Sequence, residues 1–190
     1  MEDALLEVVR RAEVDEVKRI LAEGVEINKV IIQSTHTTTP LFAAIVAGEP
    51  EVMRALLDER ADVNMSVQAC LKDTLQLRRL TGSAGGTSAR VSPLRYALEH
   101  RAPQGCVDLL VKARADVNAS SLEGRSALAC AAFWKDVVAM RILLEARADA
   151  DKSDETGRSA FFSAVSVGSV EGAAMLLEWR ASVNKRDSNG

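Results

Sequence analysis

Apolar residues along this 190-residue chain recur in short blocks with helical spacing, and polar turns separate the blocks. Four alanine-rich blocks open with Ser or Thr, followed in two cases by proline, at 39–48, 92–101, 126–135 and 159–168. A hydroxyl side chain accepts hydrogen bonds from the first backbone N–H groups of a helix, and proline at the first helical position removes no needed donor. Each block therefore predicts a short helix, and Asp3 with ALLEVVRRA plays the same part near the start.

A leucine-rich block follows each of these helices and predicts a second helix. The five blocks are VKRILAE, VMRALLDE, CVDLLVKA, AMRILLEA and GAAMLLEW. Related phrases (GVEIN, RADVN twice, RADAD and RASVN) come next and end at Asn28, Asn64, Asn118, Asp151 and Asn184, of which the last three are 33 residues apart. Short helices with one apolar face are not stable alone, so this period predicts a solenoid in which neighbouring helix pairs cover one another.

The register of these blocks resembles the ankyrin repeat, which joins a D-x-x-G-x hairpin tip to T-P-L-H-x-A-A and then to L-L-x-x-G-A-D-V-N. The tips SLEGR (121–125), DETGR (154–158) and DSNG (187–190) match. The resemblance implies an all-α repeat solenoid of stacked antiparallel helix pairs with β-hairpin loops. It implies one domain over 1–190, with repeats at about 1–28, 29–64, 91–118, 119–151 and 152–184 and the start of a sixth at 185–190.

The spacing between repeats locates two irregularities. From the terminal Asn or Asp to the next hydroxyl cap takes 8 residues in the last two junctions, 11 in the first and 28 in the second. The first junction therefore predicts a hairpin lengthened around His36, and the second predicts an insertion over 65–90. Apolar spacing within the insertion predicts a helix over 66–80, and the Gly/Ser composition that follows predicts a flexible loop over 81–90.

Two departures from the ankyrin pattern bear on stability. The histidine of T-P-L-H is replaced throughout, by Phe42, Arg95, Ala129 and Phe162. The glycine after the second helix survives only as Gly24, and the other four positions hold Arg60, Arg114, Arg147 and Arg180. If these arginines keep the left-handed backbone of that glycine, each costs about 1 kcal/mol.

Composition excludes several classes of protein. The chain is 47% hydrophobic but only 4% aromatic, which predicts a thin Ala/Leu/Val core and argues against both disorder and a large aromatic-lined ligand pocket. A net charge of −3 argues against nucleic acid as the main partner. No apolar run reaches the roughly 20 residues of a membrane span, and the acidic start does not resemble a targeting signal. We therefore expect no membrane insertion and an intracellular location, first of all the cytoplasm, with nuclear and organellar locations left open.

Few residues suggest chemistry of their own. GSAGGTS at 82–88 lacks the lysine of a phosphate loop, and neither His36 nor His100 has a motif that would orient it as a base. We expect Cys106 and Cys130 to be buried and Cys70 exposed, with no disulfide framework. The Asp residues of the repeated phrase are expected to hydrogen-bond the backbone of the repeat junction, and the Asn residues to hold their hairpin by local backbone hydrogen bonds. We therefore predict no catalytic, cofactor or metal site and no enzyme activity.

The resemblance to ankyrin repeats places recognition on the first-helix ends and the hairpin tips. The helix-end candidates are Arg10, Arg11, Val46, Glu99, His100, Phe133, Trp134 and Val167. The tip candidates are Leu122, Glu123, Arg125, Glu155, Thr156 and Arg158. Phe133 and Trp134 stand together in a chain poor in aromatics, and the alternative is that one of them packs into the next repeat. Trp179 also has two interpretations: it packs against a sixth repeat, or it contacts a partner.

Two functions remain open from the sequence. The first is a non-catalytic protein–protein interaction scaffold, whose partner segment would bring apolar anchors and acidic groups to the fourth and fifth repeats. The second is the ankyrin segment, or an accessory subunit, of a larger enzyme, channel or multiprotein assembly with its chemistry elsewhere. The pattern does not specify an oligomeric state or the identity of the partner.

Overall fold

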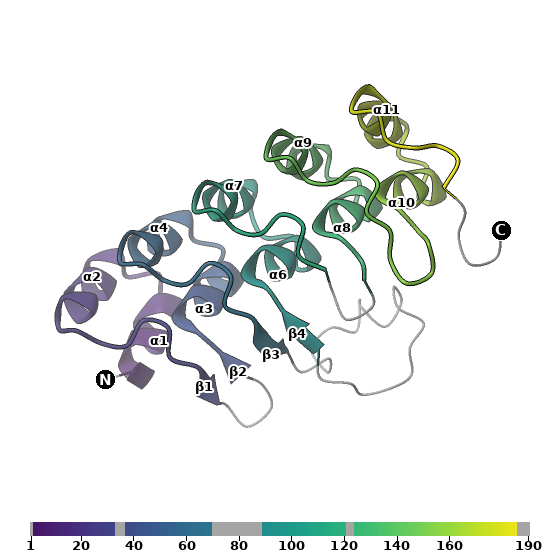
Figure 1. Ribbon diagram of the computed structural model, residues 1–190. Coiled ribbons are helices and arrows are strands. Elements are labelled where there is room, and N and C mark those ends of the chain that lie inside the picture. The colour runs from purple at the N-terminus through teal and green to yellow at the C-terminus, as the bar shows by residue number, and fades with distance from the viewer. Residues whose placement is uncertain (1, 33–36, 70–88, 121–123, 186–190) are drawn as a thin grey trace.

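The computed structural model describes residues 2–32, 37–69, 89–120 and 124–185, and the helices in these ranges form five consecutive pairs. The pairs are α1 (Glu2–Arg10) with α2 (Val14–Ala22), α3 (Pro40–Ala47) with α4 (Pro50–Asp58), α6 (Pro93–Glu99) with α7 (Gln104–Lys112), α8 (Ala127–Phe133) with α9 (Val137–Glu145), and α10 (Ala160–Ser166) with α11 (Val170–Glu178). Figure 1 shows the first helices of the pairs in one layer and the second helices in another. Each helix contacts its own partner and the same helix of a neighbouring pair, which confirms the predicted all-α solenoid.

The first helices begin where the hydroxyl residues predict. The side-chain oxygens of Thr39, Ser92, Ser126 and Ser159 accept hydrogen bonds from backbone N–H groups three residues on, at 3.4, 3.5, 3.1 and 3.4 Å. Pro40 and Pro93 occupy the first helical position in two of these helices. The caps satisfy donors that have no partner inside the helix, and this fixes the register of each repeat.

A thin core runs along the whole stack between the two layers. Its centre is made of completely buried leucines of the second helices, among them Leu56, Leu110 and Leu143. Alanines such as Ala44 and Ala132 fill the first-helix layer. Small side chains let adjacent first helices lie close together, so each pair is stabilised by its neighbours as well as by its own contacts.

The predicted insertion is a lengthened β-hairpin at its two ends. Strands β3 (Val67–Ala69) and β4 (Ala89–Val91) pair antiparallel, with Val67 opposite Val91. The expected helix over 66–80 is thus wrong at its start and the expected loop over 81–90 is wrong at its end; both valines are buried, and this cross-strand packing outweighs the helical spacing. The rest of both predictions, 70–88, lies outside the described residues.

A second hairpin lies beside the first. Strands β1 (Ile31–Ile32) and β2 (Thr37–Thr38) pair antiparallel, and β2 contacts β3 (Figure 1). His36, around which we predicted a lengthened tip, lies outside the described residues. Both irregular junctions therefore project from the hairpin side of the second and third helix pairs.

The arginines that replace glycine do adopt the left-handed backbone. The φ angles of Arg60, Arg114, Arg147 and Arg180 are 65°, 66°, 64° and 61°. In each, the following alanine donates its backbone N–H to the carbonyl five residues before it, as Ala148 does to Leu143 at 2.9 Å. The helix ends are therefore closed by a turn that an L-residue enters only with strain.

Replacing Arg147 with glycine should raise the free energy of unfolding by about 1 kcal/mol, because glycine enters this backbone region without strain. Arg141 is the matched control, since it is an exposed arginine in the middle of α9, where glycine should instead lower stability by about 1 kcal/mol. Urea denaturation of both variants measures the difference. A loss of stability in Arg147→Gly would mean that the guanidinium interacts favourably enough with the helix end to outweigh the strain.

Candidate binding surface

The Asn and Asp residues of the repeated phrase link neighbouring repeats. The side-chain oxygens of Asn28, Asn64, Asn118 and Asp151 accept the backbone N–H of Asp62, Asp116, Asp149 and Ser182, at 2.7, 2.8, 2.8 and 2.8 Å. The expectation that these Asn side chains make local backbone hydrogen bonds is therefore wrong, because each bonds a backbone donor of the next repeat. We call this series the junction ladder.

The aspartates of the phrase make the local bond instead. The carboxylates of Asp62, Asp116 and Asp149 each accept the backbone N–H two residues on, at 2.9 Å. This use accounts for their recurrence once per repeat. Within the described ranges, no three His, Cys, Asp or Glu side chains gather as metal ligands would.

Asn118→Ala should lower the free energy of unfolding by about 1 kcal/mol, because it removes the hydrogen bond from the Asp149 N–H that joins two repeats. Asn184 is the matched control: it occupies the same position of the last repeat, and no described group donates to its side chain. Urea denaturation of Asn118→Ala and Asn184→Ala measures the contrast. Equal losses in the two variants would show that the asparagine acts within its own repeat.

The candidate residues at the ends of α1, α3 and α10 lie on separate helices and do not form one cluster. Arg10 and Arg11 are exposed, and Arg11 pairs with Glu7 at 3.0 Å. Val46 is exposed near the end of α3, whereas Val167 is half-buried at the end of α10. Leu122 and Glu123 lie outside the described residues.

Glu99 is not the exposed helix-end residue that we expected. Its carboxylate is buried and paired with the guanidinium of Arg95, one turn earlier on α6, which is also buried. Arg95 stands where the ankyrin pattern has histidine, and one of its nitrogens, Nη1, is buried without a hydrogen-bond partner in the described structure. The sequence carried a signal for this pair, because Arg and Glu four residues apart lie on one helix face.

His100 belongs to a row of rings across the second and third repeats. Its ring stacks on Tyr96 with centroids 3.9 Å apart, and Tyr96 meets Phe42 edge-on at 5.2 Å. The Nδ1 atom of His100 lies 3.0 Å from the backbone carbonyl oxygen of Tyr96. Phe42 and Tyr96 were not among the sequence candidates, although Phe42 replaces the missing histidine and was visible as a departure.

Phe133 and Trp134 form the centre of the candidate surface. Their rings meet edge-on at 5.4 Å, and both side chains are half-buried at the end of α8. Arg101 lies over the Trp134 ring at 5.9 Å, and Arg125 lies over the Phe133 ring at 6.0 Å. We call these four residues the Arg–aromatic cluster.

The cluster joins three elements that are separate in the sequence. Arg101 follows α6 in a left-handed turn, Arg125 precedes α8, and the two rings end α8. Arg101 is exposed and makes no ion pair within the described residues. The indole Nε1 of Trp134 is buried beside the Cys130 sulfur and forms no hydrogen bond of ordinary geometry there. The cluster thus presents cations on aromatic faces, with one indole edge turned into the core.

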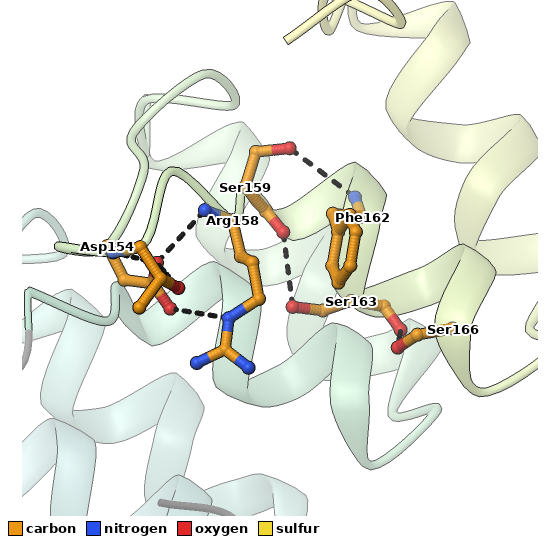
Figure 2. Close-up of polar contacts among 7 residues, drawn as sticks. Asp154, Arg158, Ser159, Phe162, Ser163 and Ser166 are labelled. Atoms are coloured by element: carbon orange, nitrogen blue, oxygen red, sulfur yellow. Dashed lines mark hydrogen bonds and ion pairs between the residues drawn. The ribbon is translucent and has the colours of Figure 1, made fainter. Parts of the chain in front are cut away.

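The hairpin tip of the fifth repeat is held from within. The Asp154 carboxylate accepts the backbone N–H of Arg158 at 2.9 Å and its Nε at 3.1 Å, as Figure 2 shows, and the Thr156 hydroxyl at 2.7 Å. Burial raises the pKa of Asp154, but these hydrogen bonds and the Arg158 charge outweigh it and lower the pKa below its ordinary value. Arg158 is therefore engaged by the tip, while Glu155 and Thr156 remain exposed.

The cysteines of the helix faces are buried, as expected. Burial, with the nearby Glu99 carboxylate, raises the pKa of Cys130 to about 12, and burial raises that of Cys106. Both thiols are therefore protonated near neutral pH and unsuited to nucleophilic chemistry. Cys70 lies outside the described residues. None of the described helices has both the length and the apolar character needed to cross a membrane.

Comparison with known families agrees with this geometry. A model of ankyrin repeats in three copies matches residues 87–187, which is more than half of the chain. A model of the single ankyrin repeat matches residues 37–66. A search of curated proteins finds no significant match to the chain.

Proposed function

Because this chain belongs to the ankyrin repeat family, whose domains typically mediate protein–protein interaction and are typically non-catalytic, we propose that it is an interaction scaffold with the Arg–aromatic cluster as its main contact. The observation that carries the proposal is the placement of Arg101 and Arg125 over the rings of Trp134 and Phe133. Trp, Tyr and Arg dominate the energetics of protein interfaces, and here two such residue types meet in one patch.

The chemistry of the cluster indicates its partner. The rings supply apolar contact area at low entropic cost, and the exposed guanidinium of Arg101 presents N–H donors that suit a carboxylate or a carbonyl. Glu99 lies two positions before Arg101, but its carboxylate is buried and paired with Arg95. Its charge therefore does not repel an incoming acidic segment. The partner segment therefore combines an apolar anchor with one or more carboxylates.

Neighbouring surface residues extend the contact to both sides. His100 and Tyr96 continue the aromatic row toward the second repeat. Glu155 and Thr156 stand exposed on the tip of the fifth repeat. A segment lying across these repeats would meet the cluster at its centre and these residues at its ends. Val167 lies at the first-helix end of the same fifth repeat, and Arg10, Arg11 and Val46 are more distant along the array.

Quantitative affinity capture tests this function. The intact chain, a Phe133→Ala/Trp134→Ala variant and a Val138→Ala/Arg141→Ala control are immobilised and exposed to the same cell extract. The control residues are exposed on α9, outside the cluster. We expect a set of proteins held by the intact chain and the control but lost from the cluster variant, each with an acidic segment that alone competes for binding. The same captured set on all three would reject the cluster as the contact.

A further inference from the structure

Four arginines recur at one place in successive repeats, at the ends of the second helices. Each stands two residues after the last residue of α4, α7, α9 or α11, at Arg60, Arg114, Arg147 and Arg180. These helices form one layer, and each contacts the next (Figure 1). Because packed helices lie about 8–10 Å apart, neighbouring arginines are separated by about the same distance. We call these four residues the arginine row.

The backbone that carries the row is tied from repeat to repeat. Each arginine is held in a left-handed turn, and the residue two positions further on donates its backbone N–H to the junction ladder. Between two of the repeats, the side-chain nitrogen of Asn64 also donates to the backbone carbonyl oxygen of Arg114 at 3.4 Å. The points from which the four side chains extend are therefore preorganised, which lowers the cost of binding a partner across several repeats.

The guanidinium groups of the row are not used inside the described structure. All four residues are exposed, and none of their side chains forms an ion pair or a hydrogen bond with the described residues. Three other exposed arginines differ in this respect, because Arg11, Arg19 and Arg54 each pair with a glutamate three or four residues away. The row therefore presents four cations that the array itself does not neutralise.

These cations occupy positions where they lower stability. Glycine enters the left-handed region without strain, and the first repeat has Gly24 at the same position, with a φ angle of 81°. Arginine at the other four positions is strained. Strained backbone is found chiefly at positions that serve a function, and no contact within the described residues accounts for these side chains. Their function is therefore to be sought in a partner.

The charges beside the row indicate which kind of anion fits it. Exposed aspartates follow three of the arginines at a distance of two residues, at Asp62, Asp116 and Asp149. Exposed glutamates also lie one or two residues before three of them, at Glu59, Glu145 and Glu178. A uniformly charged polymer such as nucleic acid would meet these carboxylates as well as the arginines. Carboxylates spaced along a polypeptide can pair with the arginines and avoid the acidic groups between them.

We propose that the arginine row is a second binding surface, which takes an extended acidic polypeptide segment with carboxylates spaced to match the repeats. A chain in the polyproline II conformation has three residues per turn and rises about 3.1 Å per residue, so every third side chain lies on one side, about 9 Å from the next. A carboxylate at every third residue thus meets successive guanidinium groups. The surface lies in the second-helix layer and needs no apolar anchor, unlike the Arg–aromatic cluster at the end of α8.

A labelled peptide of glycine, serine and glutamate, with a glutamate at every third residue, tests the proposal by fluorescence anisotropy with the full chain. The peptide has no apolar side chain to occupy the Arg–aromatic cluster. We expect binding in buffer of low ionic strength that weakens as salt is added, because exposed ion pairs are screened. A peptide of the same composition with its glutamates in one block should bind more weakly. No binding of the spaced peptide, or equal binding of both peptides, would overturn the proposal.

Glycine variants remove the charges without threatening the fold. The variant Arg60→Gly/Arg114→Gly/Arg147→Gly/Arg180→Gly should weaken binding about tenfold or more, while its urea midpoint rises as the strain is relieved. The control removes four exposed cations from the middle of second helices, as Lys18→Gln/Arg19→Gln/Arg54→Gln/Arg141→Gln. It lowers the net charge equally and should weaken binding less than about threefold. Equal losses of affinity would overturn the proposal, and so would a fall in the urea midpoint of the glycine variant, which would assign the guanidinium groups to their own helix ends.

Two further measurements separate this surface from other anion sites. Duplex DNA is the competing ligand, and the proposal is wrong if DNA binds more tightly than the spaced peptide and the glycine variant loses it. Arg101→Ala should leave binding of the spaced peptide unchanged, because Arg101 belongs to the Arg–aromatic cluster and lies outside the row. Loss of peptide binding in Arg101→Ala would place the acidic segment on the cluster and overturn the proposal. The glycine variant should still capture the partners of the cluster, so the two surfaces fail or hold independently.

Discussion

Glu99→Ala should lower the free energy of unfolding by about 3–5 kcal/mol, the largest effect of any single polar substitution in this array. The substitution removes the only partner that the described structure gives to the buried Arg95 guanidinium. An unpaired buried charge keeps its full desolvation penalty, and Arg95 cannot escape it by losing its proton, because the guanidinium stays charged. Urea denaturation followed by circular dichroism measures the loss.

A double variant distinguishes the loss of the whole ion pair from the loss of one partner, which leaves the other charge buried and unpaired. Arg95→Met/Glu99→Leu removes both charges and fills the space with apolar atoms, so it should cost far less than Glu99→Ala and approach the stability of the parent. If Glu99→Ala itself costs no more than about 1 kcal/mol, the pair is solvated rather than buried. Glu99 would then regain its place among the recognition candidates.

The burial of this pair explains why Glu99 was misplaced from the sequence. Its position in the ankyrin pattern is usually exposed, and the pattern treats each position as independent of the others. Here Arg95 replaces a histidine that would have lain between repeats, and the longer side chain needs a carboxylate on the same helix face. The coupling of one departure to a second residue one turn later is a property of packing, and a position-by-position comparison does not contain it.

The features that could be predicted are those determined by residues close to one another in the sequence. Ser126 and Ser159 cap helices because a hydroxyl before an apolar block has one favourable use. The left-handed turn at Arg114 follows from its place after a leucine-rich block, where the chain must reverse whatever residue stands there. Such signals recur once per repeat, so each confirms the others.

The insertion shows where local signals fail. The spacing of Val67 with the leucines after it satisfies a helix, and nothing within that segment contradicts one. Its actual structure at 67–69 depends on Val91, which is 24 positions further along the chain and lies opposite it in the β3–β4 pair. Pairing between strands is decided by a contact that is distant in sequence, and helical periodicity does not report it.

The Arg–aromatic cluster has the same origin. Phe133 and Trp134 attract notice as adjacent aromatics, but Arg101 does not, because it lies 33 residues earlier in the turn after α6. Stacking of the third and fourth repeats brings the two together at 5.9 Å. The two rings of this candidate site could thus be picked out from the sequence, but of its two arginines the sequence indicated only Arg125.

Trp134→Ala should weaken binding of the partner by about 2 kcal/mol or more, because a half-buried indole under a guanidinium combines apolar area with a cation–π contact. The substitution should also lower stability, since part of the Trp134 ring packs against the core. Arg101→Ala removes the exposed cation while leaving the ring, and it should weaken binding with little change in melting temperature. Titration calorimetry with the captured partner, beside thermal denaturation of each variant, gives both quantities.

The two variants together decide what the cluster does. Loss of affinity in both, with a stability change only in Trp134→Ala, is the result expected of a recognition surface built on a partly packed ring. A large fall in melting temperature for Trp134→Ala with binding intact in both would assign Trp134 to the core alone. The face of the fourth and fifth repeats would then have no anchor, and the partner would have to be sought along the aromatic row of Phe42, Tyr96 and His100, where the second and third repeats meet.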